Sequence, residues 1–222
     1  MNLSSSSRRI LQGLTVKEAM RRLVIRLPVT ACLAEAIRAT LKYKVNAVLI
    51  EDAALPLGVV SKTDLMTAYY IRLPLGTTVG EIMVGPPQFC SPQDSLDAAL
   101  DRMREYRIHR LYVREAEKQP IIGVLAYPDI VGLLYRCCRR CERSLPQRHP
   151  DGPEGEIFFR VKEVMSPNLL CYCDTDSLWE IMNGLAAYNF GAVPILDAAK
   201  IPVGVVSKTD LVLAYLHGQD PS

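Results

Sequence analysis

The string Gly58-Val-Val-Ser-Lys-Thr-Asp-Leu65 decides the fold, because it returns letter for letter as Gly204-Val-Val-Ser-Lys-Thr-Asp-Leu211. A divergent copy, Gly123-Val-Leu-Ala-Tyr-Pro-Asp-Ile130, lies between them. Internal self-similarity of this kind is typical of a chain built from copies of one supersecondary unit. We therefore interpret the sequence as three repeats.

A second short motif precedes each string by about 40 positions and marks the start of each repeat. We call it the leader; its three copies are Val16-Lys-Glu-Ala-Met20, Val79-Gly-Glu-Ile-Met83 and Val161-Lys-Glu-Val-Met165. The predicted domains are repeat 1 at 14–72, repeat 2 at 77–136 and repeat 3 at 159–218. Residues 137–158, rich in Arg, Pro and Gly, are predicted to form a basic linker.

Each repeat is predicted to fold as β-α-β-β-α. After the leader comes a stretch with apolar residues at helical spacing, which requires one buried helix face. Two short β-branched runs follow, separated in repeat 1 by a polar turn that contains Pro56, and they indicate a strand pair. The Asp of the string then opens a second helix. The predicted apolar helix positions are Leu33, Ala36, Ile37, Thr40 and Leu41; Leu96, Ala99, Leu100 and Met103; and Leu178, Ile181, Met182 and Leu185.

Composition restricts the function classes. The chain has 222 residues, 49% of them hydrophobic, which is enough for one or two compact bodies. No apolar run approaches the roughly 18 residues of a membrane span. The first residues lack the apolar core of a signal peptide, so we expect a cytoplasmic protein with reduced cysteines. The net charge of +2 is too small to indicate nucleic acid by itself.

The β-α-β-β-α order, the Val-x-Glu-x-Met leader and the Gly-Val-Val-Ser-Lys-Thr-Asp-Leu string together resemble CBS domains, the cystathionine-β-synthase-type modules. The resemblance covers about 14–217 and implies an α+β fold. In that family two domains associate through their sheets as a Bateman module and bind adenosine ligands in the clefts between them. Since no long linker separates repeats 1 and 2, we expect them to form such a pair, which leaves repeat 3 without a partner in its own chain.

The string offers binding chemistry of its own. A strand that ends in Ser and leads to an Asp at a helix start gathers side-chain oxygens and free backbone N–H groups, which suit a ribose and a phosphate. A lysine adds positive charge. The alternative is that Ser and Asp only cap the helix. The candidate ligand-binding residues are Ser61, Lys62, Thr63 and Asp64 in repeat 1, and Ser207, Lys208, Thr209 and Asp210 in repeat 3.

Repeat 2 departs from the pattern, because Ala126 replaces the hydroxyl residue and Pro128 precedes Asp129. We expect a weak or empty site there. Its strand entry is similar to that of the γ subunit of AMP-activated kinase, which implies that Arg107, His109 and Arg110 face the phosphate of a nucleotide held by Asp64. Solvated arginines and a partly buried histidine are the alternative.

The strand entries of repeats 1 and 3 carry small or apolar residues where the family places an adenine ring. Base contacts are therefore predicted for Asn46, Ala47 and Val48 and for Gly191, Ala192 and Val193, although such positions are core strand by default. Cysteines 137, 138, 141, 171 and 173 could in principle gather around zinc, and Cys138 and Cys141 have the Cys-x-x-Cys spacing, but the first three lie among the five arginines of 136–148, so surface or core thiols fit better.

No phosphate-binding loop, nucleophile elbow or zinc-protease motif occurs, and the sequence has only three histidines. These absences argue against catalysis. Two functions remain open. One is a regulatory sensor that binds AMP, ADP, ATP or S-adenosylmethionine and modulates an unidentified partner protein. The other is a non-catalytic dimerisation module with vestigial clefts that acts through the basic segment 136–148. In either case, burying the sheet of repeat 3 would require a homodimer through 161–217.

Overall fold

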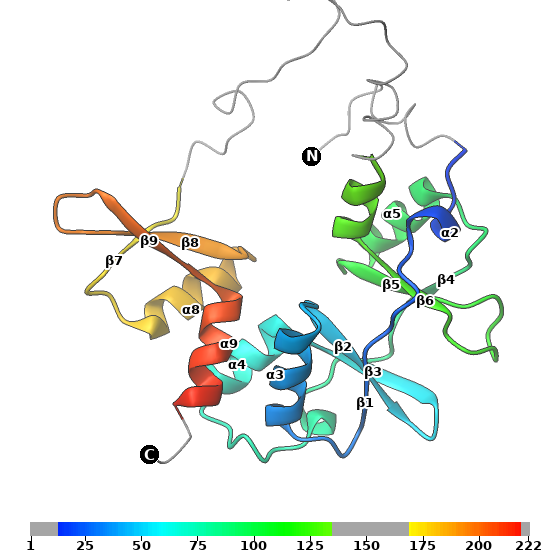
Figure 1. Ribbon diagram of the computed structural model, residues 1–222, viewed down its shortest axis with the longest axis horizontal. Coiled ribbons are helices and arrows are strands. Elements are labelled where there is room, and N and C mark those ends of the chain that lie inside the picture. The colour runs from blue at the N-terminus through cyan, green and yellow to red at the C-terminus, as the bar shows by residue number, and fades with distance from the viewer. Residues whose placement is uncertain (1–12, 135–168, 219–222) are drawn as a thin grey trace, which may run out of the picture. The chain divides into compact units, whose positions relative to one another are not determined.

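The computed structural model describes residues 13–134 and 169–218 (Figure 1). Three separate sheets of three strands occur in this part of the chain, one for each repeat. In every sheet the first strand pairs parallel with the second, and the second pairs antiparallel with the third. The strands are β1 (Arg26–Pro28), β2 (Ala47–Asp52) and β3 (Leu55–Ser61); β4 (Phe89–Cys90), β5 (Arg110–Val113) and β6 (Gly123–Ala126); and β7 (Tyr172–Cys173), β8 (Ala192–Leu196) and β9 (Pro202–Ser207).

Helices complete the predicted order in each repeat. Repeat 1 has α3 (Leu33–Lys42) and α4 (Lys62–Tyr70), repeat 2 has α5 (Leu96–Glu105) and a helical stretch at 127–134, and repeat 3 has α8 (Leu178–Ala187) and α9 (Lys208–His217). The leaders of repeats 1 and 2 form the short α2 (Val16–Ala19) and the 3-10 turn η1 (Val79–Glu81). The α+β class and the β-α-β-β-α order are confirmed.

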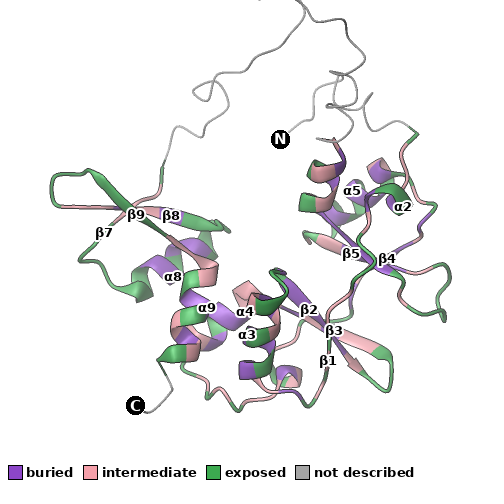
Figure 2. Ribbon diagram, viewed as in Figure 1, coloured by how far each residue is buried: buried purple, intermediate pink, exposed green. Residues whose placement is uncertain are grey.

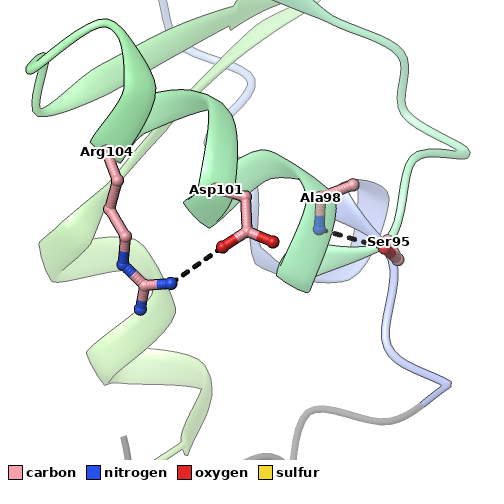
Figure 3. Close-up of polar contacts among 4 residues, drawn as sticks. All are labelled: Ser95, Ala98, Asp101 and Arg104. Carbon is pink, nitrogen blue, oxygen red and sulfur yellow. Dashed lines mark hydrogen bonds and ion pairs between the residues drawn. The ribbon is translucent and has the colours of Figure 1, made fainter. Parts of the chain in front are cut away.

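Serine side chains begin several of these helices. Ser95 Oγ accepts a hydrogen bond of 3.1 Å from the backbone N–H of Ala98 at the start of α5, and Arg104 pairs with Asp101 at 2.8 Å one turn further on (Figure 3). Such a cap satisfies one of the N–H groups that the first helical turn leaves without an intrahelical partner. The local sequence therefore sets where each helix starts.

The predicted apolar helix positions are buried in α3 and α5, apart from the half-buried Leu41, but not throughout α8. Leu33 and Leu96, the first residues of α3 and α5, are fully buried, whereas Leu178, the first residue of α8, is 43% exposed. The difference comes from the leaders. Leu33 N–H donates to Thr77 O beside one leader and Leu96 N–H to Leu14 O beside another, and no described segment covers Leu178 in this way.

Repeats 1 and 2 exchange their leaders. The segment at 15–21 packs on repeat 2, where Thr15 forms an isolated bridge with Ser95 and Arg21 forms one with Val124 of the last strand. The segment at 78–84 packs on repeat 1, where Thr78 forms an isolated bridge with Cys32 and Val84 forms one with Val59 of the last strand. By its contacts the chain divides into unit 1, formed by residues 1–24 and 87–156, and unit 2, formed by 25–86 and 157–222. Each unit therefore contains a leader that belongs, in sequence, to the other.

Repeat 3 has a partner in its own chain, contrary to the expectation that it would have none: it packs on repeat 1 within unit 2. The contact is made by helices α4 and α9 (Figure 1). Val212 and Tyr215 of α9 lie in the core of repeat 1, and Met66 of α4 lies in the core of repeat 3. Met66 and Val212 occupy the same position in the two repeats, so the exchange of side chains is reciprocal. Side chains on helices, chiefly apolar ones on the second helix of each repeat, make this contact.

Candidate functional site

The two identical strings have the same local geometry at the junction of strand and helix. In repeat 1, Asp64 Oδ2 accepts hydrogen bonds of 2.7 Å from both the backbone N–H and the hydroxyl of Ser61, and Ser61 Oγ accepts from Asp64 N–H at 3.3 Å. In repeat 3, Asp210 and Ser207 make the same bonds at 2.8, 2.7 and 3.4 Å. This is a reciprocal capping box. The capping alternative is thus realised at both positions, but it engages one oxygen of each carboxylate and leaves Oδ1 able to accept from a ligand.

The lysines and threonines of the two strings bond to each other across the contact of repeats 1 and 3. Lys62 Nζ donates to Thr209 Oγ1 at 2.9 Å, and Lys208 Nζ donates to Thr63 Oγ1 at 3.0 Å. Lys208 Nζ also lies 3.4 Å from Asn189 Oδ1, a partner that sequence reasoning missed. Capping alone could not explain why Lys and Thr recur with Ser and Asp. Their reciprocal bonds supply the physical reason.

Four of the predicted site residues therefore form one polar cluster in unit 2: Lys62, Thr63, Lys208 and Thr209. Asp64 and Asp210 flank this cluster. Burial lowers the pKa of Lys62, while the charge of Asp210 acts in the opposite direction. Burial likewise lowers the pKa of Lys208, opposed by Asp64. The pKa of Asp210 is lowered, chiefly by the hydrogen bonds from Ser207 and further by Lys62. Each lysine thus interacts electrostatically with the aspartate of the other repeat. Both helix N-termini add positive potential to the cluster.

The predicted base-contacting segments lie directly beside these helix starts. Lys62 N–H donates to Asn46 O at 3.0 Å, and Lys208 N–H donates to Gly191 O at 3.1 Å. The side chains of Ala47, Val48 and Val193 are buried in the core, as strand residues are by default, whereas Gly191 and Ala192 are exposed. A side chain added at Gly191 would meet nothing within 4 Å. The repeat 3 segment is therefore the more open of the two.

The aspartate of repeat 2 is engaged differently. Asp129 Oδ2 accepts from Ala126 N–H at 2.9 Å, and its other oxygen pairs with Arg21 Nε at 2.6 Å. Arg21 directly follows the leader of repeat 1, so this ion pair is a product of the leader exchange. Sequence reasoning missed Arg21, because nothing in its local pattern shows that it meets a residue more than 100 positions away. With both oxygens engaged, Asp129 is less able to accept from a ligand than Asp64 or Asp210.

The three predicted cations lie in unit 1. Arg107 and His109 are exposed, and the His109 ring lies 5.8 Å from that of Tyr127. Arg110 is partly buried at the start of β5; burial lowers its pKa, and an interaction with Tyr112 opposes this shift. Asp64 lies in unit 2, so a phosphate site shared by these cations and Asp64 stays a prediction.

Within residues 13–134 and 169–218, no three His, Cys, Asp or Glu side chains are placed to hold a metal ion. Cys137, Cys138 and Cys141 lie outside the described residues. None of the helices in these ranges is both long enough and apolar enough to cross a bilayer.

A model of the CBS domain family matches residues 79–136 and 161–217, which together make up just over half of the chain. The chain belongs to the CBS domain family. Both matches begin at a leader valine, Val79 and Val161, and each includes one copy of the string or its divergent form. The family model does not match repeat 1, although its string is identical to that of repeat 3.

Solved structures of CBS proteins share this fold. A putative acetoin utilization protein, AcuB, from Vibrio cholerae is 27% identical with a TM-score of 0.52, over 60% of this chain and 98% of that one. CBS domain protein PAE2072 from Pyrobaculum aerophilum, complexed with AMP, is 23% identical with a TM-score of 0.50. The match covers 57% of this chain and 99% of that one.

The CBS domain pair of protein MJ0100, in complex with 5-methylthioadenosine and S-adenosyl-L-methionine, is 20% identical with a TM-score of 0.51. The match covers 55% of this chain and 97% of that one. Each of these chains thus corresponds to little more than half of this CBS protein. No curated protein matches the chain.

Proposed function

We propose that this protein is a regulatory CBS-domain protein that binds an adenosine ligand, namely AMP, ADP, ATP or S-adenosylmethionine, and thereby modulates a partner protein. Repeat 1 is proposed to be a third CBS domain, because it has the same strand order, register and capping box as repeat 3. CBS proteins of similar fold are found with AMP and with S-adenosylmethionine, which supports an adenosine ligand for this chain.

One observation carries the proposal: in repeats 1 and 3 an aspartate at a helix start keeps one carboxylate oxygen outside the capping bonds. That oxygen can accept from the vicinal hydroxyls of a ribose, and the adjacent helix N-terminus favours phosphate. Asp64 and Asp210 are the proposed ribose acceptors. Asn46 to Val48 and Gly191 to Val193 are the proposed base contacts, and Arg107, His109 and Arg110 the proposed phosphate contacts.

Binding would regulate by changing how the repeats associate. A ligand shifts a conformational equilibrium only if it binds one arrangement better than the other. The Lys62 and Lys208 cluster joins repeats 1 and 3 through hydrogen bonds to Thr209 and Thr63. An anionic ligand beside either aspartate would compete for these lysines, so ligand binding and the contact of the two repeats are proposed to be coupled.

Calorimetric titration of the full chain with AMP, ADP, ATP and S-adenosylmethionine tests the proposal. The informative variants are Asp64→Asn and Asp210→Asn, because an asparagine oxygen can still cap the helix while its amide nitrogen replaces the acceptor for ribose. We expect each to weaken its own site at least about 10-fold, as expected for losing a hydrogen bond to a charged group. Glu180→Gln, which alters a capping box with Ser177 outside the string, is the matched control and should leave affinity unchanged.

The alternative is a non-catalytic dimerisation module that works through the basic segment 136–148. That function predicts no saturable binding of any of the four ligands and a loss of partner binding when the arginines of the segment are replaced. The carboxylate oxygens of Asp64 and Asp210 that stay outside the capping bonds support the sensor.

A further inference from the structure

Both described leaders make the same two-point contact with the repeat that receives them. Thr78 bridges the residue that caps the first helix of repeat 1, Cys32, and Val84 bridges Val59 in its last strand. Thr15 bridges Ser95, the cap of α5, and Arg21 bridges Val124 in the last strand of repeat 2. The leader valines, Val16 and Val79, are fully buried in the repeat that they join. A leader therefore forms an isolated bridge to the last strand of the sheet and covers the start of the first helix.

The leader methionines cover a glycine of the last strand in each case. A Cβ added at Gly58 would lie 2.9 Å from Met83 Cγ. One added at Gly123 would lie 2.7 Å from Arg21 O and 3.1 Å from Met20 Sδ. Only glycine lets the leader approach so closely, so the glycine of the repeated string is explained by the leader that packs on it.

Among the residues that the structure describes, none covers repeat 3 at either point. A Cβ added at Gly204 would meet nothing within 4 Å, and Val205 is 65% exposed. Leu178, next to the helix cap Ser177, is 43% exposed. Figure 2 shows β9 as largely exposed, in contrast to β6, all four residues of which are buried. No described segment fills the position that a leader fills in the other two repeats.

The backbone of β9 is also prepared for an additional strand. Val205 lies opposite Pro194, as Val59 lies opposite Leu49, and the two sheets keep the same register over this stretch. The N–H and C=O groups of Val59 point away from β2 and bond to Val84 at 2.9 and 3.0 Å. By the same register those of Val205 point outward, and Pro194 has no N–H to bond with them. An edge strand with outward-facing N–H and C=O groups is a template for strand pairing.

The sequence of the chain identifies the occupant. Val161-Lys-Glu-Val-Met165 has the valine, glutamate and methionine of the two docked leaders. Arg26 follows Met20 by six positions, Phe89 follows Met83 by six and Tyr172 follows Met165 by seven. With this short connection neither described leader packs on the sheet that directly follows it. The acceptor positions of repeats 1 and 2 are already filled. Among the described sheets only that of repeat 3 still offers one, and in a second chain it is not the sheet that directly follows this leader.

We propose that two copies of this protein exchange residues 160–166, the leader of each copy pairing with β9 and covering the start of α8 in the other. Such a reciprocal exchange is closed and isologous, so it stops at a dimer. The proposal does not depend on nucleotide binding.

Cysteine cross-linking distinguishes exchange between copies from docking within one chain. In a background with the seven native cysteines replaced, a chain with Gly204→Cys and a differently tagged chain with Met165→Cys are co-expressed and oxidised. We expect a covalent heterodimer of the two tags. The pair Gly58→Cys and Met83→Cys in one chain is the positive control, because a Cβ at Gly58 lies 3.1 Å from Met83 Cβ, a few tenths of an ångström below the Cβ–Cβ range of about 3.5–4.5 Å in a disulfide.

Two results would overturn the proposal. One is a disulfide within a single chain that carries both Gly204→Cys and Met165→Cys, which would show docking on its own sheet. The other is no cross-link while the Gly58 and Met83 control forms.

A second measurement keeps the native cysteines. Val205→Pro removes the outward N–H of β9, and proline is tolerated on an edge strand where that N–H faces away from the sheet. We expect light scattering to show that this variant is a monomer where the wild type is a dimer, and we expect its circular dichroism spectrum to be unaltered. A wild-type monomer, or a Val205→Pro variant that stays dimeric, would contradict the exchange.

Discussion

The strings at 58–65 and 204–211 are identical in sequence and in their capping bonds, but not in their surroundings. Val59 is half-buried beneath a leader, whereas Val205 is 65% exposed. The tyrosines five positions beyond the two aspartates, Tyr69 and Tyr215, stack on each other at 4.8 Å, but only Tyr215 is fully buried. Identical local sequence thus produces the same helix caps and the same strand register. The burial of the side chains depends instead on which distant segment packs against them. Substitutions made in parallel at equivalent positions separate these two contributions.

The largest difference is expected between Tyr215→Ala and Tyr69→Ala. Tyr215 fills the core of repeat 1, and its hydroxyl donates to Leu73 O at 2.5 Å. Its removal should lower the free energy of unfolding of unit 2 by about 4 kcal/mol, as expected for a large buried ring. Tyr69→Ala should lower it by about half as much, because that ring is only partly buried.

Trp179 provides the readout for both variants. It is the single tryptophan of the chain and stacks on Tyr70 of repeat 1 with ring centroids 3.5 Å apart, so its fluorescence reports whether repeats 1 and 3 stay together in a denaturant titration. Tyr215→Phe is the control, with an expected loss of about 1 kcal/mol for the hydrogen bond. Equal effects of the two alanine variants would contradict the asymmetry seen between the repeats.

The same substitution in the three glycines of the strings should give a graded series. Gly123→Ala places a methyl group 2.7 Å from a backbone oxygen and should destabilise unit 1 by about 3 kcal/mol, because a backbone atom cannot give way easily. Gly58→Ala meets the flexible Met83 side chain and should destabilise unit 2 by about 1 to 2 kcal/mol.

The methyl group that Gly204→Ala adds would meet nothing within 4 Å, so this substitution should change folding stability by less than about 0.5 kcal/mol. If leaders are exchanged between copies, however, it should weaken the dimer. Thermal denaturation by circular dichroism at low protein concentration measures the first effect and light scattering the second. A strong folding defect in Gly204→Ala would mean that β9 is covered within its own chain.

Two cysteines in first strands allow a smaller pH-dependent test. Burial raises the pKa of the Cys90 thiol from 9.0 to about 12, with a further contribution from Asp94, whereas Cys173 is exposed. The raised pKa means that the stability from keeping this thiol neutral is complete below pH 9 and is lost as the pH rises towards 12. At pH 10 wild type should have lost about 1.4 kcal/mol relative to Cys90→Ala. Thiol labelling at pH 8 should modify Cys173 quickly and Cys90 slowly, and fast labelling of Cys90 would refute its burial.

The smallest effect is expected for the reciprocal lysines. Lys62→Met removes a hydrogen bond to Thr209 but also removes an ammonium group whose pKa burial lowers, so the net change should stay within about 1 kcal/mol. Because the folded-state pKa lies below 10.5, the penalty for the charged form is present at neutral pH and is relieved as the pH approaches 10.5. Wild type should therefore gain stability relative to Lys62→Met over that range. Lys208→Met should behave in the same way, and opposite pH trends would contradict the paired geometry.

The sequence predicted the repeats, their strand order and most of the buried helix faces correctly. It also placed Ser61 with Asp64 and Ser207 with Asp210, since those pairs are three positions apart. Asp129 with Arg21, and Lys62 with Thr209, could not be predicted, because each pair is separated by more than 100 positions and depends on how repeats pack. The same holds for Leu178, which has the helical spacing of a core residue but is covered by no segment that the structure describes.

By itself, the sequence determined the local structure of this protein: where strands alternate, where each helix is capped and which face of it is apolar. These properties depend on neighbours within a few positions, so identical strings yield identical caps at 61–64 and 207–210. Only the tertiary structure decided which repeat receives a leader and which repeat packs on which. Those contacts depend on apolar surfaces and edge strands that segments far apart in the sequence cover. Two identical strings therefore cannot by themselves determine their different surroundings.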